Sequence, residues 1–179
     1  STIFSTCGLG FAQSALIYAV DLDCSPELVR LLLDDPRVDP NAAFLDHQGQ
    51  KETALMVACR CGEDRNAELV RVLLEHPRTD PNTQIDGGNT ALMVACYSME
   101  NCSIEAIRAI LKDPRTDPNI ENSHKETALM IACYSYSDKY FSSYDSYECP
   151  RPEFLEPAVR LFLENPRTAP NIEAMKGSS

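Results

Sequence analysis

Three histidines and eight cysteines are the side chains of this sequence whose chemistry best suits catalysis or metal binding. His47, His76 and His124 lie far apart along the chain, with no nucleophile motif beside any of them. No two cysteines have the CxxC spacing, and Cys59 and Cys61 are too close together for the usual zinc knuckle. Glycine-rich phosphate loops and HExxH motifs are also missing. We therefore expect no catalytic site, no bound metal, no cofactor and no small-molecule substrate.

A segment rich in tyrosine and serine, residues 134–149, has the composition of a protein-binding loop. It holds five of the seven tyrosines of the chain, with serines between them. Tyrosine offers a wide, rigid contact area and serine an adaptable hydrogen bond, which is why binding loops combine the two. Packing of this segment on the rest of the chain, or disorder, are the alternatives. The candidates for partner contact are Tyr134, Tyr136, Tyr140, Phe141, Tyr144 and Tyr147.

The charge balance narrows the class of partner. The net charge is −11, whereas a nucleic-acid-binding protein needs a basic stripe that releases counterions from phosphates. The acidity favours a basic protein surface as partner, or it serves solubility alone. No apolar run reaches the roughly 20 residues that span a bilayer, so we expect no membrane insertion.

An internal repeat must position these residues. The segment Thr53–Cys59 (TALMVAC) returns at Thr90–Cys96 and, as TALMIAC, at Thr127–Cys133, each copy 37 residues after the last. A weaker copy is Ser14–Val20. A second conserved block follows every copy: LVRLLLDDPRVDPN (28–41), LVRVLLEHPRTDPN (69–82), AIRAILKDPRTDPN (106–119) and AVRLFLENPRTAPN (158–171). The fourth repeat carries fifteen additional residues between its two blocks, and these include the tyrosine-rich segment.

Each repeat reads as two helices followed by a hairpin. Thr53 suits the N-cap of a first helix, in which Leu55, Ala58 and Cys59 share one face. Ser25 followed by Pro26 suits the start of a second helix. The Pro-Arg dipeptides end the second helices, because proline cannot continue a helix. The Asp-Pro-Asn turn and the glycines beyond it predict a hairpin tip.

Cys59, Cys96 and Cys133 occupy the same place in three repeats, which is typical of a small buried residue. We therefore interpret all eight cysteines as thiols in a reducing compartment, which makes the protein intracellular and, by preference, cytoplasmic. The arginines after each proline, such as Arg78 and Arg115, stand two residues before an aspartate in three of the four repeats. We expect the arginine of one repeat to meet the aspartate of the next and to set the register of the stack.

This pattern resembles the ankyrin repeat, whose consensus contains T-P-L-H-x-A-A, V-V-x-L-L-L and D-V-N. TALMVAC matches the first block with Ala for Pro and Met for His, and Asp80-Pro-Asn82 matches the last. The resemblance implies an all-α solenoid of stacked helix-turn-helix repeats with β-hairpin loops. We expect one domain over residues 1–179, with repeats at about 14–48, 49–85, 86–122 and 123–175.

The resemblance also implies a function. Ankyrin-type proteins bind other proteins through hairpin tips and first helices, which form a concave surface. At the tips, side chains differ between repeats, either because they bind or because solvent imposes nothing on them. The tip candidates are Gln48, Gln84, Asp86, Asn89, Asn122 and His124. We expect a non-catalytic adaptor or targeting domain, alone or within a larger protein; the alternative is a structural subunit embedded in a large complex.

Overall fold

The computed structural model describes residues 10–22, 24–45, 50–60, 64–97, 104–134 and 152–169. These residues form eight helices and two short strands. The helices are α1 (Gly10–Asp21), α2 (Pro26–Asp34), α3 (Ala54–Arg60), α4 (Asp64–Glu75), α5 (Ala91–Tyr97), α6 (Ile104–Lys112), α7 (Ala128–Tyr134) and α8 (Pro152–Glu164). The strands are β1 (Phe44–Leu45) and β2 (Lys51–Glu52). Each repeat thus contributes one helix pair, as the sequence predicts.

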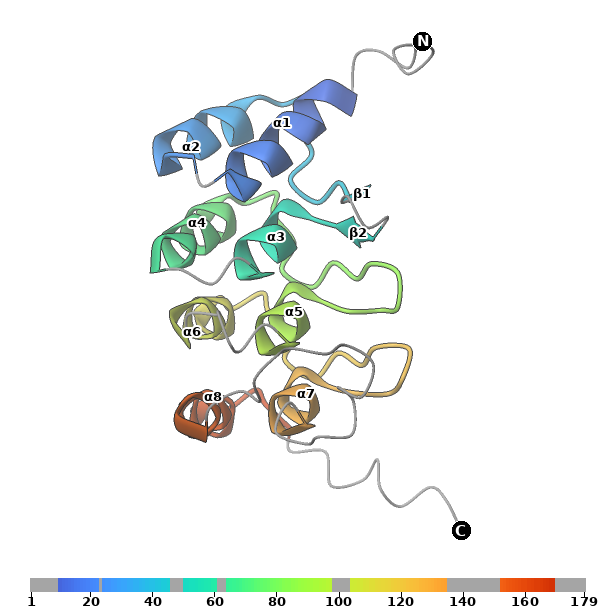
Figure 1. Cartoon of the computed structure of the whole chain (residues 1–179), viewed down its shortest axis with the longest axis vertical. Coiled ribbons are helices and arrows are strands. Elements are labelled where there is room, and N and C mark those ends of the chain that lie inside the picture. The colour runs from blue at the N-terminus through green and yellow to red at the C-terminus, as the bar shows by residue number, and fades with distance from the viewer. Residues whose placement is uncertain are drawn as a thin grey trace, which may run out of the picture.

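The helices stack in two parallel layers. Figure 1 shows α1, α3, α5 and α7 in one column and α2, α4, α6 and α8 in the other. The loops that connect successive repeats project from the first column, away from the second (Figure 1). We call the surface formed by these loops and by α1, α3, α5 and α7 the hairpin-side face. This is an open-ended all-α solenoid, in which each repeat buries its helices against its neighbours.

Threonine hydroxyls cap the N-terminal ends of α3, α5 and α7. The backbone N–H groups of Met56, Met93 and Met130 each donate to the hydroxyl of the threonine three residues earlier, at 3.3–3.4 Å. Ser25 caps α2 in the same way, with Pro26 at the first turn. Each cap satisfies a donor that the helix leaves unpaired and stabilises the helix by about 1 kcal/mol.

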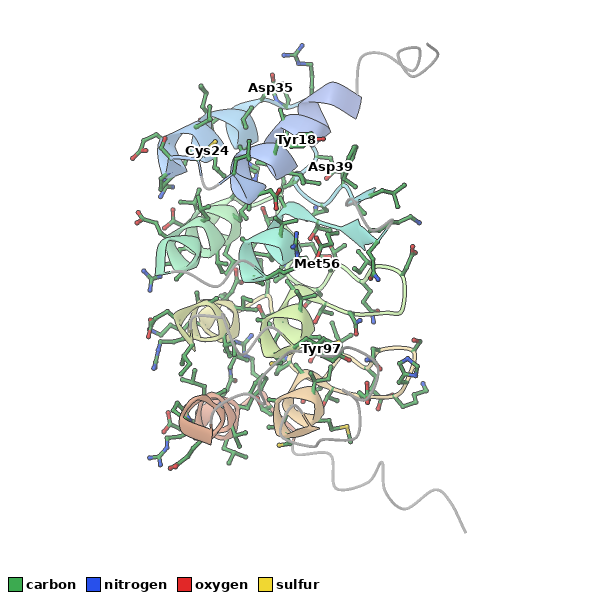
Figure 2. All side chains as sticks on the ribbon, viewed as in Figure 1. Tyr18, Cys24, Asp35, Asp39, Met56 and Tyr97 are labelled. Carbon is green, nitrogen blue, oxygen red and sulfur yellow. The ribbon has the colours of Figure 1, made fainter. Side chains whose placement is uncertain are left out.

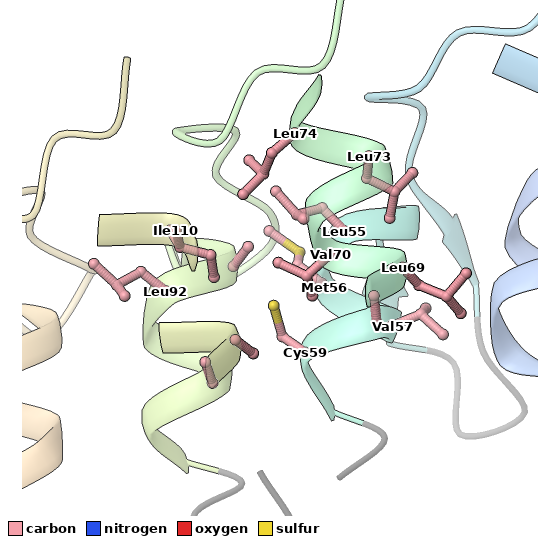
Figure 3. Packing of buried hydrophobic residues seen from close by; sticks show 14 of the residues in the cluster. Leu55, Met56, Val57, Cys59, Leu69, Val70, Leu73, Leu74, Leu92 and Ile110 are labelled. Atoms are coloured by element: carbon pink, nitrogen blue, oxygen red, sulfur yellow. The ribbon is translucent and has the colours of Figure 1, made fainter. Parts of the chain in front are cut away.

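A continuous apolar core runs between the two layers. Figure 3 shows part of it, where Met56 and Cys59 of α3 lie among leucine and valine side chains of α4. Cys59 and Cys96 are fully buried, as predicted. The same prediction is wrong for Cys133, which is exposed. Its helix α7 packs on α5 and α8, and no helix among the described residues covers its other side.

The conserved arginines join each repeat to the one before it. The guanidinium of Arg78 donates to the carbonyl oxygens of Leu33 and Val38, at 2.7 and 2.8 Å, and thereby closes the C-terminal end of α2. Arg115 makes the same contacts to Leu74 and Thr79 at the end of α4. Arg167 repeats them at the end of α6. The last carbonyl groups of a helix lack partners within the helix and carry partial negative charge, so a guanidinium is well suited to them.

The predicted pairing of each arginine with the aspartate of the next repeat is therefore wrong. Among the described residues, the conserved aspartates stay within their own turns: Asp80, for example, accepts from the backbone N–H of Asn82 at 2.9 Å. The repeat-to-repeat partner in this turn is asparagine. Asn41 donates to the carbonyl of Arg78 and accepts from the N–H of Asp80, both at 2.7 Å. Asn82 and Asn119 make the corresponding pairs with the repeats that follow them.

One turn of this series differs from the others. Asp35, Asp113 and Asn165 each accept from the backbone N–H of the arginine two residues later, at 2.9–3.0 Å. The second repeat has His76 at this position, and its Nδ1 is buried without a hydrogen-bond partner among the described residues. Burial, with Arg78 nearby, lowers the pKa of His76. The turn after α4 is thus the least satisfied of the four.

We predict that His76→Asp stabilises the protein by about 1 kcal/mol at neutral pH, because it restores the acceptor and pairs with Arg78. Below a pH of about 6.5 the unfolded chain binds a proton at His76 more readily than the native protein, so acidification destabilises the wild type at this site. The pKa of Asp35 is lowered to about 2 by hydrogen bonds from Arg37. We therefore expect an aspartate at position 76 to stay ionised over the whole pH range in which His76 titrates.

Thermal melting between about pH 7.5 and pH 5 tests this. His76→Asp is expected to melt higher than the wild type, with the gap widening toward pH 5. His76→Asn supplies the neutral acceptor that Asn165 provides in the fourth repeat. Equal losses of melting temperature on acidification in the wild type and both variants would refute the assignment to His76.

Candidate functional site

The hairpin loops are linked to one another by hydrogen bonds. Among the described residues, regular strands occur only in the first loop, where Phe44 pairs with Glu52 and Leu45 with Lys51. The second loop closes through the N–H of Ile85 to the carbonyl of Asn89, and the third through Asn122 and Glu126. Between the loops, Ser123 donates to the carbonyl of Gly87 from both its N–H and its hydroxyl, at 2.9 and 2.8 Å. The loops therefore form a connected row along the stack.

Two predicted tip residues supply these links. The side-chain amide of Gln84 donates to the carbonyls of Gly88, at 2.6 Å, and Glu121, at 3.0 Å, so it bridges the second and third loops. Asn122 is buried, and its side chain accepts from two backbone N–H groups of its own loop. It also donates to Asn89 and to Glu126, both at 3.1 Å. These two amides stabilise the loops, and Asn89, which accepts from Asn122, is half-buried.

Asp86 and His124 are the exposed members of the predicted set. The carboxylate of Asp86 lies 3.3 Å from Nζ of Lys51, which joins the second loop to the first. Gln48, Tyr136, Tyr140, Phe141, Tyr144 and Tyr147 lie outside the residues that the structure describes. Tyr134 is the last residue of α7, and its side chain also lies outside them.

Gly88 lies where the backbone of the second loop packs closely on that of the third. Its φ of +77° lies in the left-handed region, which a residue with a Cβ adopts at a cost. A Cβ built at this position would come within 3.0 Å of the backbone nitrogen of Ser123. We predict that Gly88→Ala lowers the free energy of unfolding by about 1–3 kcal/mol.

Gly87→Ala is the matched control, since Gly87 has a similar φ of +86° but its Cβ would meet only the side chain of Asn89, at 3.8 Å. Chemical denaturation of the two variants separates the free-energy cost of the lost loop contact from the cost of backbone strain. Equal losses would show that the close approach to Ser123 contributes nothing.

A second set of residues that differ between repeats lies at the ends of the first-layer helices. The residue directly after the conserved Val20, Cys59, Cys96 or Cys133 is Asp21, Arg60, Tyr97 and Tyr134 in turn. Tyr97 is half exposed, and its hydroxyl lies 3.5 Å from the carboxylate of Glu126 in the next loop. Figure 2 shows Tyr18 and Tyr97 on the first-layer helices α1 and α5. This position thus holds an acidic, a basic and then two aromatic residues, whereas the motif before it is nearly constant in the last three repeats.

Two of these side chains, Asp21 and Arg60, border a groove between α1, α3 and the first hairpin. Its volume is about 260 Å³. Exposed Tyr18, Phe44 and Leu45 form apolar walls. Charged groups also border it: Arg60 donates from Nε to Glu52 at 3.1 Å and lies 3.5 Å from Asp21. The groove therefore combines exposed apolar surface with charge on the hairpin-side face.

The sequence analysis names Tyr134 as part of the tyrosine-rich segment but misses Asp21, Arg60 and Tyr97, because it compares the repeats only at the hairpin tips. The signal is nevertheless present: the residue after each conserved helix motif is acidic in one repeat, basic in the next and aromatic in the last two. The opposite face is different. There, Arg30 of α2 pairs with Glu75 of α4, and Arg71 of α4 with Glu105 of α6, so these charges serve contacts between neighbouring repeats.

The described residues contain neither a metal-binding cluster nor a membrane-spanning helix. Within the described ranges, no cluster of three or more His, Cys, Asp or Glu side chains could hold a metal ion. None of the helices in the same ranges is long and apolar enough to cross a bilayer. The four cysteines placed there form no disulfide with one another: Cys24, Cys59, Cys96 and Cys133.

Comparison with known proteins agrees with the repeat geometry. The family model for ankyrin repeats in three copies matches residues 16–122, which is more than half of the chain. A search of curated proteins gives no match. Beyond residue 122, α7 and α8 continue the two layers with the same threonine cap and the same arginine and asparagine contacts. Both the match and the stack of capped helix pairs lead to one conclusion: this chain belongs to the ankyrin repeat family.

Proposed function

We propose that this protein is an adaptor or targeting module that binds a protein partner on its hairpin-side face. Ankyrin repeats are generally protein–protein interaction modules, and the family is typically non-catalytic. The observation that carries the proposal is the variable position at the ends of α1, α3 and α5, where Asp21, Arg60 and Tyr97 change on an otherwise constant framework. A surface that varies while its scaffold does not is expected of a recognition site.

The exposed aromatic side chains support the same face. Tyr18 and Tyr97 expose about half of their surface there, beside the exposed apolar side chains of the first hairpin. Tyrosine is enriched in binding surfaces because its large ring orders few torsions on binding and its hydroxyl finds hydrogen bonds. Asp86 and His124 lie on the same row of loops and extend the proposed contact along the stack. The linked loops hold these residues in fixed relative positions before a partner arrives.

The tyrosine-rich insertion, residues 134–149, is the second element of the proposal. It begins at the end of α7, on the first layer of helices that forms the hairpin-side face. Its tyrosines and Phe141 would add contact area to the fourth repeat. We propose an intracellular site of action, consistent with a reducing compartment for the thiols.

A capture experiment from native extract tests the proposal. The intact protein is compared with a variant carrying Tyr18→Ser and Tyr97→Ser, with a variant lacking residues 138–148, and with Glu68→Ala on α4 of the second layer. Proteins captured by the wild type and by the Glu68 variant, but not by the double tyrosine variant, are the expected result. Loss on the deletion alone would place recognition in the insertion. Equal capture by all four proteins, with melting temperatures unchanged, would contradict the proposal.

A further inference from the structure

The groove at the first repeat has a charge balance that selects among partners. Two carboxylates, Asp21 and Glu52, and one guanidinium, Arg60, border it. The formal charge of this group is therefore −1, on a chain whose net charge is −11. A cationic side chain is attracted by this arrangement, whereas an acidic one is opposed by two carboxylates and by the field of the whole chain.

The carboxylates also retain hydrogen-bonding capacity. Arg60 bonds to Oε1 of Glu52, but Oε2 of the same carboxylate is buried without a donor among the described residues. The contact between Arg60 and Asp21 is long, at 3.5 Å, and the Asp21 side chain is about half exposed. An ionised carboxylate has about four acceptor sites, so Asp21 can take a further donor from solvent or from a partner. Asp21 is the accessible anion of the groove.

The walls and the size of the groove add two constraints. Tyr18, Phe44 and Leu45 present apolar surface next to Asp21, and an aromatic ring face attracts a cation as well as an apolar group. The volume of about 260 Å³ is below the roughly 300–1,000 Å³ of typical small-molecule pockets. The groove is open on a protein surface and fits one or two side chains of a partner.

We infer that this groove binds a lysine or arginine side chain adjacent to an apolar residue, presented by an exposed segment of a protein partner. The cation is received by Asp21, and the apolar neighbour packs on Tyr18, Phe44 and Leu45. The inference rests on the proposed function and specifies the partner chemistry at the first repeat. The expected occupant of the groove is a protein segment that is both basic and apolar. Acidic segments and purely apolar segments are the competing occupants.

Synthetic peptides of random sequence on an array, probed with the labelled full-length protein, test this directly. Peptides with lysine or arginine next to leucine or phenylalanine are expected to bind most strongly. Asp21→Asn is expected to weaken their binding by about threefold to tenfold, and Tyr18→Ala to weaken the apolar preference. Glu68→Gln, which removes one exposed carboxylate of α4, is the matched control and is expected to change neither.

Salt supplies an independent readout, because raising sodium chloride from about 50 to about 300 mM screens an exposed ion pair. Binding of the basic peptides should fall in the wild type and change less in Asp21→Asn. A preference for acidic peptides, an equal basic preference in Asp21→Asn, or no peptide binding would each overturn the inference. Capture by way of Tyr97, which lies outside the groove, would survive these outcomes, so failure here is distinct from failure of the proposed function.

Discussion

Arg115→Ala is expected to lower the free energy of unfolding by about 2–4 kcal/mol. The guanidinium of Arg115 donates to the carbonyls of Leu74 and Thr79 in the preceding repeat. It also donates to the carboxylate of Asp113 in its own turn. Removing it leaves the end of α4 without its donor and leaves the half-buried Asp113 without its counter-charge. Hydrogen bonds to a charged group contribute about 1.5–3 kcal/mol, more than neutral ones.

Arg37 provides a control with the same residue type and the same turn. It pairs with Asp35, but it belongs to the first repeat and donates to no preceding helix among the described residues. Its side chain is 76% exposed, against 37% for Arg115. We expect Arg37→Ala to cost less than about 1 kcal/mol, as exposed ion pairs do. Denaturant titration of both variants measures the difference. Equal losses would mean that the arginine acts within its own turn and that the contact between repeats is unimportant.

Leu92→Ala, in the centre of the core, is expected to cost about 2–5 kcal/mol. Leu92 is 1% exposed on α5, and its side chain lies next to that of Ile110, on the side of α5 away from Met56 and Val70 (Figure 3). Its loss removes apolar contact and leaves a cavity that the linked helices cannot close fully. Because each repeat relies on its neighbours, the change weakens two interfaces at once.

The control for this substitution is Leu31→Ala. Leu31 of α2 is 67% exposed, although its counterpart in the second repeat, Val72, is buried in the core. We expect a change within about 0.5 kcal/mol, since exposed leucines contribute little. Thermal or chemical unfolding reports both values. A small loss for Leu92→Ala would contradict the assigned repeat register.

The repeat period made most of this fold predictable. The three copies of the helix motif and the Pro-Arg turns located the helix pairs, and the threonine caps are found where the sequence places them. Contacts between repeats were harder to predict, because a side chain in a conserved turn has several partners within reach. The arginines donate to backbone carbonyl groups of the preceding repeat. A sequence pattern does not show which backbone carbonyl group a side chain contacts.

The repeat pattern also could not predict which side chains are buried at the ends of the stack. Cys133 shares its motif with Cys59 and Cys96, yet it is exposed because the described chain places no further helix against it. Likewise, Gln84 and Asn122 vary between repeats as binding residues do, while their amides hold the loops together. Variation alone therefore does not distinguish a contact residue from one that adapts a loop to its neighbour.

The central claim is that a protein partner contacts the hairpin-side face. Site-specific photocrosslinking tests it most directly, with a photoreactive phenylalanine analogue placed at Tyr97 on this face or at Arg71 on the opposite layer. Both positions are exposed, so the two proteins differ in the face that they probe. In native extract we expect a discrete crosslinked protein from position 97 and none from position 71. The same adduct from position 71 only, or from neither position when the wild type still captures its partner, would contradict this account.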